Sequence, residues 1–233
     1  MDSGTPGDER ARPLAVQSAS SASRPQATPQ TQTPDAAPAA PVTRVDPSAY
    51  VDTMRRGTAD FGNSDFASAR AKFEDALKNK PNDPEILNNL GLVLERQGQV
   101  DAAIDRFDQA AKIDPKSWAY HFNLAHASGA RQDWDRAIAE YRQARDIFPT
   151  DYATQYNLAL TLHRKGDEVA AIPEFEKAIM LAPAEATFHL SLAASLEKVG
   201  RRADAKSEYE QYLEMAPNGA DAEAVRAHLQ GLK

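Results

Sequence analysis

Residues 84–117 read PEILNNLGLVLERQGQVDAAIDRFDQAAKIDPKS, and this stretch decides the fold. It holds two apolar stripes with the spacing of a helix face, three and four residues apart: Leu87, Leu90 and Leu94, then Ala103, Phe107 and Ala110. Gly98 lies between the stripes and opens a turn. Pro115 closes the second stripe, because proline lacks an N–H and disfavours helix in the residue before it. The stretch therefore predicts a helix–turn–helix unit.

The same pattern recurs every 34 residues along the chain. A proline closes each unit, at Pro81, Pro115, Pro149, Pro183 and Pro217. An alanine lies 12 residues before each proline: Ala69, Ala103, Ala137, Ala171 and Ala205. An aromatic residue lies eight before it: Phe73, Phe107, Tyr141, Phe175 and Tyr209. A period of this length is typical of a solenoid. One hairpin cannot bury its apolar face alone, so the stability of such an array comes from stacking.

These residues resemble the tetratricopeptide repeat family, whose unit is a helix–turn–helix of 34 residues. The second unit matches that pattern without a gap, at Leu90-Gly91, Leu94, Gly98, Ala103, Phe107, Ala110 and Pro115. The resemblance implies an all-α fold, a right-handed superhelix or α-solenoid. We expect five units within residues 48–217, at 50–83, 84–117, 118–151, 152–185 and 186–217. Residues 218–233 are expected to form a capping helix that begins at Asp221 and packs Val225 and Leu229 on the last unit.

Residues 1–47 differ in composition from the rest of the chain. Residues 1–46 hold seven of the 15 prolines and no Phe, Tyr, Trp or Ile. Such a segment buries too little apolar surface to offset its conformational entropy, so we expect a disordered Pro/Ala/Ser-rich tail. Pro25 and Pro29 are four residues apart, unlike the three of a PxxP ligand, so a linker is favoured over a docking motif.

The composition excludes several functional classes. The chain has 233 residues, no cysteine and a formal charge of −7. It therefore lacks a disulfide framework, thiolate metal ligands and the electrostatic signature of a nucleic-acid binder. No apolar run approaches the roughly 18 residues of a membrane span, and no signal peptide is recognisable at the start. The sequence as it stands predicts a cytoplasmic protein, or a periplasmic or envelope protein if a signal segment is missing.

Few residues carry the spacing of catalytic or metal chemistry. The histidines are His121, His126, His163, His189 and His228, and no HExxH motif, calcium loop or phosphate loop accompanies them. We expect them to be exposed or to line the groove. The carboxylates are spread over helix surfaces near lysine or arginine. The sequence therefore predicts no enzyme, no catalytic residue, no metal site and no cofactor.

Three asparagines occupy one register position in consecutive units, Asn89, Asn123 and Asn157. In a stacked array the first helix of each unit lines the concave surface, so these amides would form a column. A primary amide both donates and accepts, and can pair with the backbone of an extended peptide. The column resembles the asparagine ladder in the repeats of O-GlcNAc transferase, and that resemblance implies the backbone-binding role. The alternative is that asparagine is merely common at this position.

Further residues beside the column complete the candidate groove. One per unit, Asn88, Phe122 and Tyr156 precede the asparagines directly, and Leu92, His126 and Leu160 follow one turn later. Large apolar side chains on a concave surface suit a binding groove, although they could instead pack against the neighbouring first helix. Arg96 and Arg164 end their first helices and could form a basic rim.

We therefore expect a non-enzymatic protein–protein interaction scaffold that binds a peptide segment of a partner in its concave groove. One alternative is a self-assembling structural component, because the first unit lacks an obvious N-terminal cap. Another is an envelope-tethered bacterial secretion or pilus assembly factor. This would require a truncated N-terminus. Under the first alternative the chain would be a self-associating array, and otherwise a monomer.

Overall fold

The computed structural model describes residues 47–231, which form eleven helices and no strand. The helices are α1 (Pro47–Gly62), α2 (Phe66–Asn79), α3 (Pro84–Arg96), α4 (Val100–Ile113), α5 (Trp118–Ala130), α6 (Trp134–Ile147), α7 (Tyr152–Lys165), α8 (Glu168–Leu181), α9 (Ala186–Lys198), α10 (Arg202–Met215) and α11 (Ala222–Gly231). The predicted all-α solenoid of five helical hairpins and a capping helix is confirmed. The predicted disordered tail falls almost entirely on residues outside this range.

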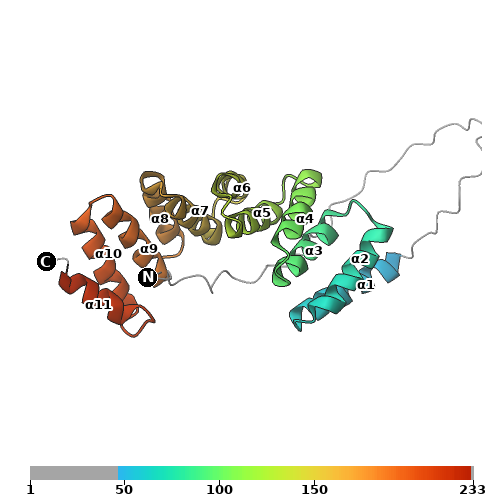
Figure 1. The fold of residues 1–233 in the computed structure, drawn as a ribbon, viewed down its shortest axis with the longest axis horizontal. Helices are drawn as coiled ribbons and strands as arrows, with labels where there is room; N and C mark the ends of the chain where they lie inside the picture. The colour runs from blue at the N-terminus through green and yellow to red at the C-terminus, as the bar shows by residue number, and fades with distance from the viewer. Residues whose placement is uncertain (1–46, 232–233) are drawn as a thin grey trace, which may run out of the picture. The chain divides into compact units, whose positions relative to one another are not determined.

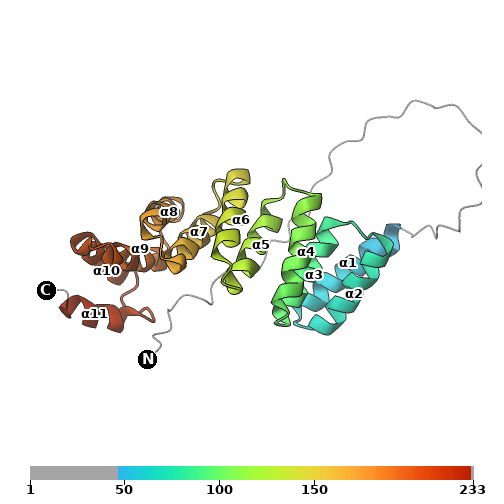
Figure 2. The same ribbon diagram turned by 45° about the horizontal axis from the view of Figure 1, so that its top comes forward.

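The hairpins stack side by side along a curved row (Figures 1 and 2). Each odd-numbered helix from α1 to α9 packs on its own partner, and each even-numbered helix from α2 to α8 packs on the next hairpin, while α10 packs on α11. The backbones of consecutive first helices also approach one another closely, from α1 to α9, whereas within residues 47–231 the second helices meet one another through side chains, as in the ion pairs Arg136–Asp108 and Arg145–Glu174. The first helices therefore lie on the inside of the curve and the second helices on the outside.

One turn position repeats in every unit with a left-handed backbone. Gly98, Gly166 and Gly200 have φ between 74° and 89° there. Ser64 and Gln132 occupy the same position with φ near 60°. Glycine adopts this conformation without the steric penalty that a Cβ brings, so Ser64 and Gln132 are strained versions of the same turn.

Helix ends follow the sequence signals. Aspartates cap five helices by accepting a backbone N–H with the side chain: Asp65, Asp83, Asp133, Asp151 and Asp167. Each second helix ends two residues before its proline, as predicted. Pro173 lies inside α8 and does not interrupt the helix.

The core of each unit lies between its two helices. The alanines and aromatics of the repeat pattern are buried, with Phe107 and Phe175 fully enclosed. A Cβ added at Gly91 would lie 2.6 Å from the Phe107 ring, so α3 and α4 approach closely because this residue is glycine. On α11, Ala222 and Val225 are buried while Glu223 and Arg226 are exposed, which gives the array a polar outer end. None of the helices described is both long enough and apolar enough to cross a bilayer.

Candidate functional site

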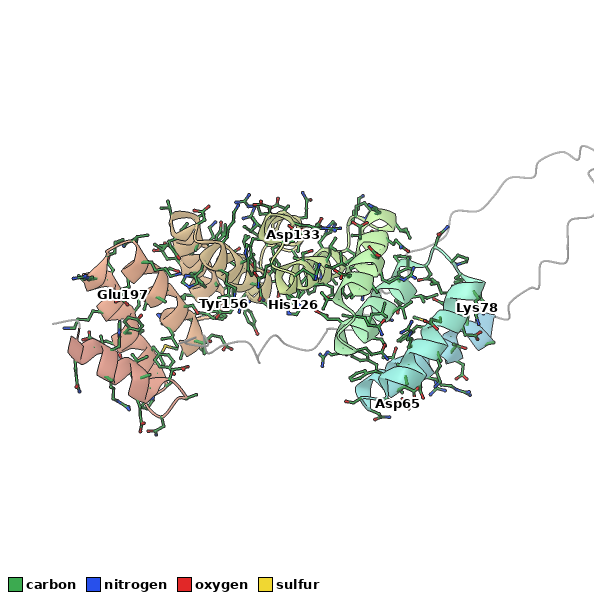
Figure 3. The ribbon with its side chains drawn as sticks, in the orientation of Figure 1. Asp65, Lys78, His126, Asp133, Tyr156 and Glu197 are labelled. Atoms are coloured by element: carbon green, nitrogen blue, oxygen red, sulfur yellow. The ribbon has the colours of Figure 1, made fainter. Side chains whose placement is uncertain are left out.

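The inner face is the surface of α1, α3, α5, α7 and α9 that lies on the inside of the curve. The candidate groove residues predicted from the sequence belong to three of these helices, α3, α5 and α7. In Figure 3, Tyr156 and His126 lie on this inner side, and Asp133, at the start of α6, lies on the opposite side.

The asparagine column is present in register, but its members differ in what they contact. Asn89 and Asn157 are half-buried. Asn123 is only 7% exposed, and its Nδ2 donates to the Oδ1 of buried Asn88, 2.8 Å away on α3. The Nδ2 of Asn157 donates to the backbone oxygen of Ala153 in its own helix, also at 2.8 Å. Two of the three side-chain amides therefore already donate one hydrogen bond within the protein.

Apolar and aromatic side chains surround the column. Phe122, Tyr156 and Leu160 are half-buried, with part of each surface open, and Leu92 is 7% exposed. The Phe122 ring lies edge-on to Tyr141 in its own unit at 5.5 Å. Tyr156 stacks on Phe188 of the next unit at 4.3 Å. These side chains therefore pack against neighbours and still contribute surface to the inner face.

Two aromatics next to predicted groove residues in the chain were missed as site candidates by the sequence reasoning. Trp118 and Tyr152 begin α5 and α7, one turn before Phe122 and Tyr156, and both are half-buried. The Trp118 ring lies 6.1 Å from the Phe122 ring. Their spacing of 34 residues, with an aromatic four residues after each, was the available signal.

Side chains of the predicted basic rim make contacts within the protein. The Arg96 guanidinium lies over the ring of Phe61 at 5.7 Å. Lys198, at the same register, forms an ion pair with Glu168 at 2.9 Å. Arg164 is exposed at the equivalent place on α7. His126 is half-buried and its Nδ1 lies 2.8 Å from Glu95 of the preceding unit.

The histidines do not all lie where the sequence reasoning put them. His121 is buried and faces the second helix of its unit, where its Nδ1 lies 2.7 Å from Glu140. His189 makes the same contact with Glu208 at 2.6 Å. The expectation of exposed or groove-lining histidines is therefore wrong for these two, because this helix position faces the partner helix. Hydrogen bonding to Glu140 raises the pKa of His121, against the opposing effect of burial.

A buried ionic cluster joins the fourth and fifth units. Glu168 is 7% exposed, and His163 Nδ1 lies 2.8 Å from both its Oε2 and the hydroxyl of Ser195. Burial raises the pKa of Glu168, but hydrogen bonds from Lys198, His163 and Ser195 outweigh it and lower the pKa overall. Ser195 and Glu168 both contact the Nδ1 atom of His163. In a hydrolase triad the two groups contact different nitrogens of the imidazole, so this arrangement cannot relay a proton from the serine to the glutamate.

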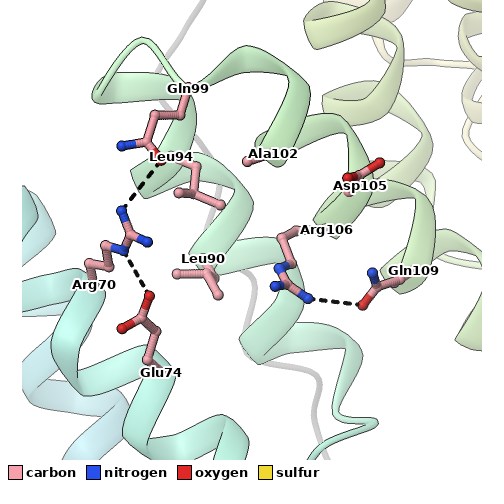
Figure 4. Close-up of a pocket in the computed structure, with 9 residues that line it drawn as sticks. All are labelled: Arg70, Glu74, Leu90, Leu94, Gln99, Ala102, Asp105, Arg106 and Gln109. Atoms are coloured by element: carbon pink, nitrogen blue, oxygen red, sulfur yellow. Dashed lines mark hydrogen bonds and ion pairs between the residues drawn. The ribbon is translucent and has the colours of Figure 1, made fainter.

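A pocket of about 160 Å³ lies between α2, α3 and α4 (Figure 4). Arg70 bonds Glu74 and Gln99 across it, and Arg106 bonds Gln109. These bonds join five of its six polar lining side chains to one another. Within residues 47–231, no three side chains are grouped as metal ligands.

Comparison with known proteins places the chain in a family. A tetratricopeptide repeat profile matches residues 54–117 and 122–186, which together exceed half of the chain. Among solved structures, a crystal structure of MamA protein is 24% identical with a TM-score of 0.69, covering 76% of this chain and 96% of MamA. A MamA AMB-1 structure is 20% identical with a TM-score of 0.66, covering 77% and 98%. A MamA RS-1 double mutant is 18% identical with a TM-score of 0.69, covering 72% and 94%.

At these identities the MamA structures show a shared fold. The profile match and the repeated register of the turn, alanine and aromatic positions agree with it. The chain belongs to the tetratricopeptide repeat family.

Proposed function

We propose that this protein is a non-enzymatic interaction scaffold whose inner face binds an extended peptide segment of a partner protein. The family and fold support a protein-interaction role in general. What we propose beyond that role is the mode of peptide binding and the residues that bind the peptide.

One observation carries the proposal: the middle of the inner face combines half-buried aromatic surface with amide groups in a repeating register. Phe122 and Tyr156 offer apolar area, and Asn89 and Asn157 offer donors and acceptors beside them. Ligand sites typically combine apolar walls with a few placed polar groups. Because the amides repeat once per unit along the row, they suit a ligand that is itself a linear repeat of peptide groups.

The test is a binding titration with a matched control. Asn89, Asn123 and Asn157 are replaced by alanine in one variant. The control replaces Gln109, Gln143 and Lys177, which are exposed and occupy one register position on the second helices of the same three units. Peptides selected from a displayed random library on the full chain serve as ligands. Binding weakened by the first variant and unchanged in the control supports the proposal; the reverse pattern overturns it.

Self-assembly by head-to-tail stacking is the weaker alternative, because one of the α1 residues that would meet another hairpin is charged. Ile86 and Val93 on α3 are fully buried against the preceding hairpin. The corresponding residues of α1 are Asp52, which pairs with Arg55, and exposed Ala59. Stacking another unit there would bury a charged group. A monomer of constant mass by light scattering over a hundredfold range of concentration is the expected result. The cytoplasmic location stays a prediction that cell fractionation would check.

A further inference from the structure

Glu168 meets two side chains that can carry a positive charge, at the joint between the fourth and fifth units. It is the first residue of α8, and its Oε2 lies 2.8 Å from the Nδ1 of His163 on α7. Its Oε1 lies 2.9 Å from the Nζ of Lys198, the last residue of α9. The same Nζ lies 3.4 Å from the Nε2 of His163. We call these three side chains the Glu168 cluster; each comes from a different helix.

A neutral imidazole fits the Glu168 cluster. With its proton on Nδ1, His163 donates to Glu168, and its bare Nε2 accepts an N–H from Lys198. One negative charge then faces one positive charge. The ion pair between Lys198 and Glu168 holds the end of α9 to the start of α8, and so the fifth unit to the fourth.

A protonated imidazole does not fit the same arrangement. Both ring nitrogens then carry protons, so two positive groups, the imidazolium and the Lys198 ammonium, lie 3.4 Å apart. The side chains of His163 and Glu168 are only 13% and 8% exposed, whereas that of Lys198 is 53% exposed. Because an unpaired buried charge is costly, the cation that can reach water is the one that leaves. Protonation of His163 therefore displaces Lys198.

Other charged side chains at this end of α5, α6, α7, α8 and α9 are engaged elsewhere. They are Lys165 with Asp135, Arg136 with Asp108, His126 with Glu95, Glu197 with His228, Asp167 as the cap of α8, and Arg164, whose charge acts on Tyr141. Burial opposes the ionisation of Glu168, yet hydrogen bonds from Lys198 and His163 bring its pKa below the ordinary value. Glu168 therefore stays a carboxylate over the range in which histidines titrate.

We propose that the Glu168 cluster is a pH-responsive tie between the fourth and fifth units. While His163 is neutral, Lys198 pairs with Glu168 and holds α9 to α8. Once His163 is protonated, it replaces Lys198 as the cation paired with Glu168, and Lys198 turns into water. Histidine is the side chain that ordinarily changes charge between pH 5 and 8, so the tie loosens as the pH falls through that range. The fifth unit and α11 beyond it are then held less firmly to the array.

Thermal unfolding of full-chain variants tests the exchange of cations. Lys198→Gln should lower the melting temperature by about 2–4 °C at about pH 8 and by less than about 1 °C at about pH 5.5. The cost of the substitution is compared at each pH, since other histidine–glutamate pairs also change the absolute stability with pH. An equal cost at the two pH values would overturn the proposal.

Two histidine backgrounds show which residue makes the cost depend on pH. In His163→Gln, Lys198→Gln should cost the same at both pH values, because no ring charge can replace Lys198. His189→Gln is the matched control: His189 pairs with Glu208 on α10, so the pH dependence should persist in that background. A pH dependence that persists in His163→Gln, or is lost in His189→Gln, would overturn the proposal.

Side-chain NMR of the wild-type chain gives a second test that does not depend on how the His163 variant folds. With histidine and lysine labelled, the Lys198 Cε resonance should shift with the same pH midpoint as the His163 ring resonances, because one protonation drives both changes. A Lys198 resonance that stays constant between pH 5 and 8, or that follows a different midpoint, would overturn the proposal.

Discussion

Replacing Asn123 by alanine should destabilise the protein clearly, whereas replacing Asn157 by alanine should hardly change its stability, although both residues occupy the same register position. In Asn123→Ala the Oδ1 of Asn88 loses its donor while remaining 9% exposed. Leaving a buried acceptor unsatisfied costs about 1–3 kcal/mol. For a folded region of this size, each kcal/mol lowers the melting temperature by about 2–4 °C, so a loss of about 4–8 °C is expected for a central value of about 2 kcal/mol.

Asn157→Ala removes only a bond to the backbone of its own helix, at a half-buried position. Alanine is the better helix former by up to about 0.7 kcal/mol, which offsets that loss. The free energy of unfolding should therefore change by less than about 0.5 kcal/mol.

Urea titration followed by circular dichroism at 222 nm measures both changes, and the double variant Asn88→Ala/Asn123→Ala completes the cycle. A coupling energy of about 1 kcal/mol or more between Asn88 and Asn123 is expected. Equal stability loss in Asn123→Ala and Asn157→Ala, or no coupling in the cycle, would refute the conclusion that the Asn123–Asn88 hydrogen bond holds α5 to α3.

Four further changes test the local physics. His121→Gln should reduce stability more at pH 6 than at pH 9. The raised pKa of His121 stabilises the folded protein below the unfolded pKa of about 6.5, and this stabilisation is lost as the pH rises through the folded pKa. Equal stability losses at the two pH values would contradict the contribution of His121. Gln132→Gly should stabilise by about 0.5–1 kcal/mol in urea titration by removing the left-handed strain. Gly91→Ala should cost about 1–3 kcal/mol because its Cβ meets the Phe107 ring, and a neutral change in melting temperature would count against that contact. Asp151→Ala should cost about 1 kcal/mol by uncapping α7, measured in the same way.

The architecture could be predicted from the sequence because its determinants are local and repeated. A proline after each second helix and a small residue at each close approach leave the same mark in five units. The turn position was visible where it holds glycine, as at Gly98. Ser64 and Gln132 show that the neighbouring helices impose the same left-handed turn on residues that do not favour it.

The site was predicted less completely because contacts between units depend on side-chain direction as well as register. The spacing identified Asn89, Asn123 and Asn157 as equivalent. It could not show that Asn123 turns toward Asn88, since that depends on a polar residue one unit earlier and one position back. His121 was misjudged for a related reason: its partner Glu140 lies on the second helix, 19 residues away.

The central claim is that the inner face, between the third and fourth units, is where a partner segment binds. Site-specific photo-crosslinking tests it most directly, with p-benzoylphenylalanine in place of Phe122 in one full-length variant and in place of Gln143 in another. Gln143 is exposed on α6, away from the inner face. Irradiation should link the selected peptide to position 122 and not to position 143. Crosslinking at position 143 with none at position 122 would contradict it.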